Sequence, residues 1–216
     1  MTDRDARLLR ELVAAHGRTV AEEAGVGLRN TPQPLYQLLV LAVLLSARIR
    51  GSVAIATARE LFDAGLRDPR RMTEAGRHRR IEALGRGGYR RYDERTSAQL
   101  GDGAKLVTER WGGDLRRLRE EADGDVSALR RLLREVPGLG PAGTDIFLRE
   151  VQRVWPEVAP YLDAKALSGA RRLGLPEDAG RLTGAAGGTE PAVLAAALVR
   201  AALDAHVAEE CLSHAG

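Results

Sequence analysis

The chain has 216 residues, enough for one large domain or two small ones. Its composition, 44% hydrophobic and 29% charged residues, is typical of a globular protein and excludes a disordered one. The net charge of +3 is mildly basic, and the positive charge is almost all arginine, because Lys105 and Lys165 are the only lysines. Arginine suits phosphate contacts because its planar guanidinium binds two oxygens. A GC-rich genome explains the same arginine bias equally well.

Cysteine, histidine and apolar patterns exclude several classes of protein. The single cysteine, Cys211, excludes an intrachain disulfide and any iron–sulfur or zinc site held by four cysteines. The four histidines are dispersed without metal-ligand spacing, so no metal site is expected. No charged-then-apolar leader begins the chain, and the longest apolar run, residues 35–47, is too short to span a bilayer. We therefore expect a cytoplasmic protein without a membrane partner, associated with the nucleoid if the source is bacterial. A monomer is also expected.

Apolar residues recur at helical spacing along nearly the whole chain, which predicts an all-α protein without strands. Residues 30–34, with two prolines, should separate the first helix from the next. Ser52 is the expected N-cap of a helix that turns Val53, Ala56, Leu61 and Phe62 inward. Gly101 and Gly103 should interrupt a longer helix. The other helices are predicted, in chain order, over residues 3–16, 34–47, 69–75, 79–84, 92–111, 126–136 with Asp125 as N-cap, a segment containing 146–154, 164–173 and 191–212.

A short stretch, VPGLGPAGTDIF at residues 136–147, joins two of these helices. Its glycines allow a tight turn with bare backbone, and Pro141 suits the first position of the following helix. Backbone N–H groups at a helix N-terminus bind anions such as phosphate. The pattern is that of a helix–hairpin–helix motif, which holds a DNA backbone without reading its sequence. The alternative is a plain corner between two helices. The residues that we expect to contact DNA here are Gly138, Leu139, Gly140, Ala142 and Gly143.

Asp163 follows a proline-containing loop and precedes a helical run, which by itself indicates an N-cap. Its position after the hairpin, together with residues 38–62, resembles the helix–hairpin–helix (HhH-GPD) DNA glycosylase superfamily of the endonuclease III type over about residues 35–170. In that superfamily an essential aspartate follows the hairpin by one helix and one loop, and Asp163 matches it. We expect a two-lobed helical fold with a central lobe over 34–154, its hairpin motif at about 126–154, and a second lobe formed by 1–33 and 155–216.

The resemblance implies an enzyme that flips a damaged or mispaired base out of double-stranded DNA and hydrolyses its N-glycosidic bond in base excision repair. A carboxylate near C1′ stabilises the positive charge on the sugar and activates the attacking water, so Asp163 is the expected catalytic residue. Ala142 occupies the position of the lysine with which bifunctional members cut the strand, which predicts a monofunctional glycosylase. Two alternatives stay open. One is residual strand cleavage through the N-terminal amine or through Lys165, although the spacing of Lys165 on a helix points it away from Asp163. The other is a member that binds DNA without catalysis.

The remaining expectations also come from the resemblance. The four-cysteine iron–sulfur cluster is missing, so no cofactor is expected beyond a monovalent cation that the hairpin of the family could hold. Arg48 stands where endonuclease III-type enzymes carry a glutamine that fills the gap left by the flipped base, and Arg50 is close by. Solvated phosphate contacts are the alternative for both. Tyr161 is a candidate for the pocket wall or for the core. The loop with Arg86 and Tyr89 is expected to be solvated. Residues 140–145 look most like those of mismatch-type thymine or uracil glycosylases, yet alkylated and oxidised bases stay open as substrates.

Overall fold

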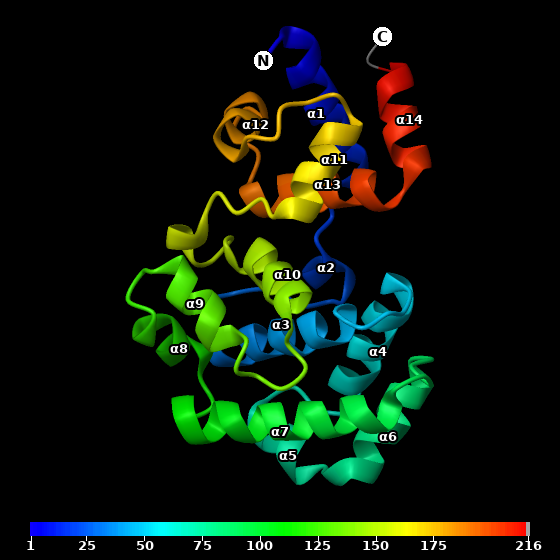
Figure 1. The fold of residues 1–216 in the computed structure, drawn as a ribbon. Helices are drawn as coiled ribbons and strands as arrows, with labels where there is room; N and C mark the ends of the chain where they lie inside the picture. Colours follow the sequence, from blue (N-terminus) through cyan, green and yellow to red (C-terminus); the bar gives the residue numbers. More distant parts are fainter. Residues whose placement is uncertain (215–216) are drawn as a thin grey trace. The chain divides into compact units, whose positions relative to one another are not determined.

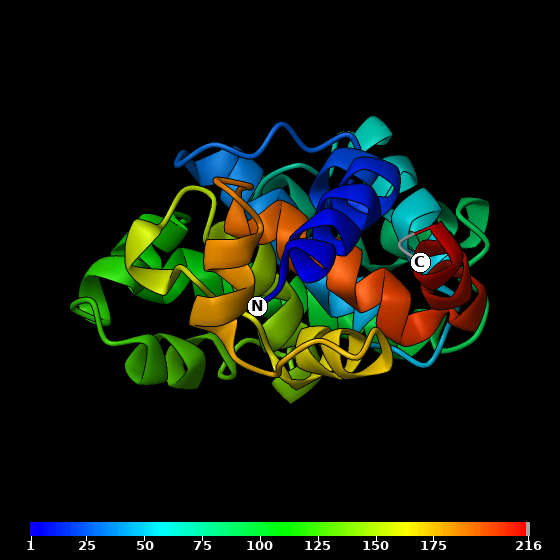
Figure 2. The same cartoon turned by 90° about the horizontal axis from the view of Figure 1, so that it is seen from above.

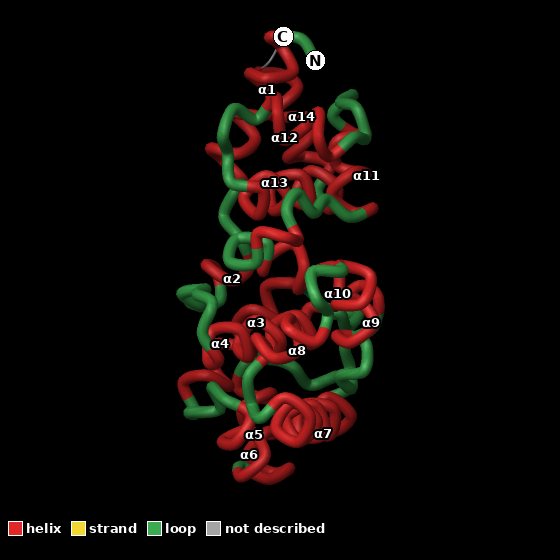
Figure 3. Tube along the Cα trace, turned by 90° about the vertical axis from the view of Figure 1, so that its left-hand side faces the viewer, coloured by secondary structure: helices red, strands yellow, loops and turns green. Residues whose placement is uncertain are grey.

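The computed structural model describes residues 1–214, and in this range it contains helices and loops but no strand (Figure 3). The expected all-α class is confirmed. The chain forms two compact units, one of Met1–Val20 with Leu148–Gly216 and one of Ala21–Phe147. The sequence instead predicts that the boundaries of the central part lie at residues 34 and 154.

Side-chain bonds to the backbone explain why the boundaries lie elsewhere. Arg59 donates a hydrogen bond to the carbonyl of Glu23. This bond connects the segment that precedes the two prolines of residues 30–34 to the unit Ala21–Phe147. The Gln152 amide bonds both backbone groups of Tyr161, donating to its carbonyl at 3.1 Å and accepting from its N–H at 2.7 Å. This ties the end of the helix after the hairpin to the C-terminal segment. Such bonds leave no trace in an apolar pattern.

The unit Ala21–Phe147 is built around one apolar helix (Figure 1). That helix, α3, is buried along nearly its whole length, as its continuous apolar sequence predicts, and it contacts α4, α7 and α8. The long helix α7 packs against α5 and α6. The helices associated with this unit are α2 (Val20–Glu23), α3 (Pro32–Leu45), α4 (Gly51–Asp63), α5 (Pro69–Glu74), α6 (Gly76–Arg86), α7 (Asp93–Trp111), α8 (Leu115–Glu121), α9 (Val126–Leu133) and α10 (Pro141–Val151), which contains the boundary.

The predicted interruption of the long helix is wrong, because α7 runs without a break through both of its glycines. A Cβ at Gly101 would lie 2.7 Å from Nη2 of Arg80, so this glycine makes room for a buried arginine. Arg80 is 8% exposed and donates hydrogen bonds of 2.9 Å to the carbonyls of Met72 and Ser97. Burial lowers the pKa of this guanidinium. The glycine serves packing between α6 and α7 and does not end a helix.

Other predicted helix bounds in this unit are shifted. Helix α4 begins at Gly51 with Arg50 as its N-cap, so Ser52 is not the cap. The inward face of α4 carries Ala54 and Ala58, whereas Ala56 is exposed. The structure also places α3 at 32–45 and α6 at 76–86, ends α5 at 74, α9 at 133 and α10 at 151, and begins α7 at 93. Helices α2 and α8 were not predicted.

The unit formed by the two chain ends has its own apolar core of leucine and alanine. Its helices are α1 (Asp3–His16), the 3-10 turn Pro156–Val158, α11 (Ala164–Arg172), α12 (Ala179–Ala185), α13 (Pro191–Leu203) and α14 (Ala205–His214). Helix α13 contacts α1, α11 and α14, and Figure 2 shows α1 crossing it. A Cβ at Gly169 would lie 1.9 Å from the carbonyl oxygen of Leu198, so α11 and α13 touch through their backbones.

The predicted single C-terminal helix is wrong, because α13 and α14 are separate helices bent by 108°. Asp204 lies between them with an extended backbone, and its Oδ1 accepts the N–H of His206 at 2.9 Å. An aspartate that caps a new helix start explains the break. Within residues 1–214 no single helix is long and apolar enough to cross a membrane, and this bent pair meets that criterion only when both helices are taken together.

Candidate functional site

The predicted hairpin is a turn between α9 and α10, and Gly138 determines its shape. Its φ of +87° is a conformation that side chains rarely adopt. A Cβ there would also lie 3.1 Å from Cγ1 of Val43 and 3.2 Å from Cβ of Gln99. The carbonyl of Gly138 accepts a hydrogen bond of 3.2 Å from the Ser46 hydroxyl. The backbone conformation therefore favours glycine at this position, and the close packing against α3 and α7 leaves little room for a side chain.

Gly140, two residues later, is required by neither conformation nor packing. Its φ is not positive, and a Cβ added to it would meet no atom within 4 Å. Its carbonyl accepts the N–H of Thr144 at 2.9 Å, which starts α10. The first turn of a helix leaves its N–H groups without an intrahelical acceptor, here those of Ala142 and Gly143. The open space beside Gly140 therefore leaves bare backbone approachable next to a helix N-terminus.

The other predicted contact residues of the hairpin differ in exposure. Ala142 is exposed on the first turn of α10. Leu139 is 2% exposed, so its side chain belongs to the core and only its backbone can meet a ligand. Gly143 is buried, and a Cβ there would lie 2.9 Å from Leu139 and 3.1 Å from Ser46. Its glycine is explained by close packing against α3.

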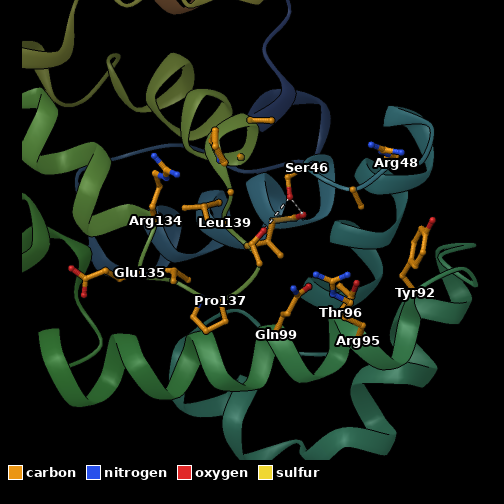
Figure 4. A pocket seen from close by; sticks show the side chains of 18 of the residues that line it. Ser46, Arg48, Tyr92, Arg95, Thr96, Gln99, Arg134, Glu135, Pro137 and Leu139 are labelled. Atoms are coloured by element: carbon orange, nitrogen blue, oxygen red, sulfur yellow. Dashed lines mark hydrogen bonds between the residues drawn. The ribbon is translucent and has the colours of Figure 1, made fainter.

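An open pocket of about 720 Å³ lies beside the hairpin, entirely within the unit Ala21–Phe147 (Figure 4). It brings the hairpin together with Arg48, two predicted sites that are far apart in the sequence. Arg95 and Arg134 line the same pocket and are exposed. The acidic group of the lining, Glu135, is paired with Arg110. The pocket therefore presents three arginine side chains and the open backbone of the hairpin, a combination suited to a polyanion.

Helix α7 contributes residues to this pocket that the sequence did not lead us to expect. Arg95 and Gln99 are four residues apart and line it from one face of the helix. That helical spacing is the signal that could have found them. In contrast, Arg50 is exposed as the N-cap of α4 but does not line the pocket.

The loop between α6 and α7 is solvated only in part. Arg86, the last residue of α6, is half exposed and pairs with Glu60 at 3.1 Å, in agreement with the expected exposure. Tyr89 is 2% exposed, which contradicts that expectation, and its hydroxyl lies 3.0 Å from Oγ1 of Thr96. Burial raises the pKa of this phenol. The exposed aromatic ring of the loop is Tyr92, which is 39% exposed and lines the hairpin pocket.

Asp163 is the N-cap of α11, and its Oδ1 accepts the N–H of Ala166 at 3.1 Å. Nη1 of Arg149 lies 3.1 Å and 3.0 Å from the two carboxylate oxygens. The side chains of this pair are 7% and 12% exposed, for Asp163 and Arg149 respectively. The carboxylate is thus charge-paired and nearly enclosed. A ligand that contacts it has to displace the guanidinium or bind beside it.

The two neighbours of Asp163 that the sequence points to, Tyr161 and Lys165, differ in exposure. Tyr161 is half-buried, and its backbone is fixed by Gln152 as described above. Lys165 is exposed on α11, one residue before the buried Ala166. Within residues 1–214 no group of three or more His, Cys, Asp or Glu side chains could hold a metal ion.

Comparison of the chain with protein-family models, with curated proteins and with solved structures finds no match.

Proposed function

We propose that this protein is a monofunctional DNA N-glycosylase that acts on double-stranded DNA with a damaged or mispaired base. The observation that carries the proposal is the hairpin pocket, in which Gly140 leaves bare backbone open among Arg48, Arg95 and Arg134. Helix α10 begins at this backbone, and the positive end of its dipole favours a phosphate. Such contacts position a duplex without selecting its sequence.

The proposed chemistry is hydrolysis at C1′ of the flipped nucleotide. The bond from C1′ to the base nitrogen breaks, its electron pair leaves with the base, and water adds its hydroxyl to C1′ while its proton is removed. Asp163 stabilises the positive charge on the sugar and accepts that proton. The enclosed ion pair with Arg149 means that at least one carboxylate oxygen has to be released when DNA binds.

The same ion pair favours a second candidate function, a glycosylase-like protein that binds DNA without cleaving the N-glycosidic bond. With 7% exposure and both oxygens facing one guanidinium, Asp163 also has the environment of a purely structural N-cap. The two candidates share the hairpin pocket and differ only in whether base is released.

The test is a panel of duplexes that carry uracil or thymine opposite guanine, an alkylated purine or an oxidised base. We expect one class to yield abasic sites, with the DNA strand intact until alkali is added. The physical reason is that Ala142 has no nucleophile with which to form a covalent sugar adduct. Gel electrophoresis before and after alkali measures both results.

Each other outcome has its own meaning. Tight duplex binding without abasic sites on any member of the panel would favour the non-catalytic candidate. Efficient trapping of a protein–DNA adduct with borohydride, lost in Lys165→Ala, would replace the monofunctional assignment with a strand-cleaving one. A protein that binds no duplex at all would overturn both candidates.

A further inference from the structure

We infer that Tyr92 is a stacking platform for an unpaired nucleobase in the hairpin pocket. The inference rests on the proposed DNA binding and adds to it a contact that recognises a base removed from the stack. Tyr92 lies at the start of α7, at the edge of the pocket (Figure 4).

The exposure of this ring is unusual for the molecule. Among the described residues, the large hydrophobic side chains that are exposed are those of Met1, Tyr92 and Leu203. Of these, Tyr92 lines the pocket that also holds the hairpin. A tyrosine ring offers a flat π face of the kind on which bases stack, and stacking does not depend on which base is present.

Contacts on both sides of Tyr92 fix the backbone that carries the exposed ring. The loop before it is anchored at Gly87, where a Cβ would lie 2.3 Å from Cα of Thr57. It is anchored again by the buried Tyr89, whose hydroxyl meets Thr96. The N–H of Thr96 in turn bonds the carbonyl of Tyr92 at 2.8 Å. Tyr92 itself has a φ of +70°, a conformation uncommon for a bulky residue.

The groups around the ring indicate a nucleotide as the occupant. The guanidinium carbon of Arg91 lies 4.9 Å from the ring centroid, so the ring already interacts with a cation, and with 39% of the residue exposed it still offers surface to a base. Arg95 is one helical turn away, and Arg48 lines the same pocket. An aromatic face among arginines matches the combination of base and phosphate in an unstacked nucleotide.

The experiment compares a duplex that carries one bulged 2-aminopurine with the fully paired duplex of the same length. Wild type and Tyr92→Phe, which keeps the ring, should prefer the bulged duplex and quench the probe's fluorescence. Tyr92→Asn removes the ring, and asparagine tolerates a positive φ, so the fold should be kept. We expect this variant to bind the paired duplex like wild type and to lose about 5- to 100-fold in affinity for the bulged one, along with the quenching.

The outcomes separate this inference from the proposed function. A folded Tyr92→Asn variant with unchanged preference and quenching would overturn the platform and leave DNA binding intact. Wild type that binds the paired duplex without preferring the bulge would have the same meaning. Wild type that binds neither duplex would overturn the proposed function together with the platform. Circular dichroism and a thermal melt verify that the variant is folded.

Discussion

Asp163→Asn is expected to lower base release by about 100- to 1000-fold while duplex affinity stays near that of wild type. The substitution keeps the shape of the side chain but removes the charge that we propose to stabilise the sugar cation. Steady-state release of the base from the substrate found in the duplex panel measures the first effect, and fluorescence anisotropy measures the second.

The ion pair with Arg149 demands a control for this variant. Removing one partner of an enclosed charge pair costs up to about 3–5 kcal/mol, so a melt has to show that Asp163→Asn is folded at the assay temperature. Asp114→Asn is a matched control. Asp114 is also an N-cap paired with an arginine, its Oδ2 lying 2.6 Å from Nη2 of Arg116, and it does not line the hairpin pocket. Full base release by a folded Asp163→Asn variant would remove the catalytic assignment.

Gly140→Glu is expected to weaken binding to every duplex by roughly 30- to 100-fold, because a carboxylate would face the phosphate at the open backbone. Lesion preference should not change, since phosphate contacts carry no sequence information. The melting temperature should stay near that of wild type, because φ is not positive and the space beside Gly140 is open. Affinity for duplexes with and without a lesion, measured at several salt concentrations, gives the result.

Gly138→Ala serves as the matched variant. It should lower the stability of the protein, while the folded variant keeps its affinity for duplex DNA. Its positive φ and the close approach of Val43 and Gln99 predict a loss of about 1–3 kcal/mol in the free energy of unfolding. A folded Gly140→Glu variant that binds duplex as tightly as wild type would show that the hairpin is only a corner between α9 and α10.

Apolar spacing predicted the helical class well, because leucine and alanine stripes report directly on the buried faces of helices. It failed where a single side chain decides the local structure. Asp204 caps a new helix and splits the apolar run of the C-terminus. Gly101 leaves α7 unbroken because Arg80 fills the space that the glycine leaves. Neither effect can be read from a local window of sequence.

The candidate site was predictable only in part for the same reason. The turn at the hairpin glycines and the N-cap at Asp163 were predicted because turns and caps have local residue signatures, whereas the catalytic role of Asp163 is implied only by the resemblance. Tyr92 and Arg95 join the hairpin pocket only through tertiary packing of α7. The ion pair of Arg149 with Asp163 joins a helix to a loop. The residue type at position 149 alone therefore does not predict this pair.

The contact between Arg80 and Gly101 also constrains how this sequence can change. A Cβ at position 101 would lie 2.7 Å from the guanidinium, so the arginine would have to shift away from the carbonyls of Met72 and Ser97 to which it donates. The two positions are therefore coupled through packing. A double-mutant cycle of Arg80 and Gly101, read as free energies of unfolding, should give a non-additive result, because each residue occupies space that the other leaves.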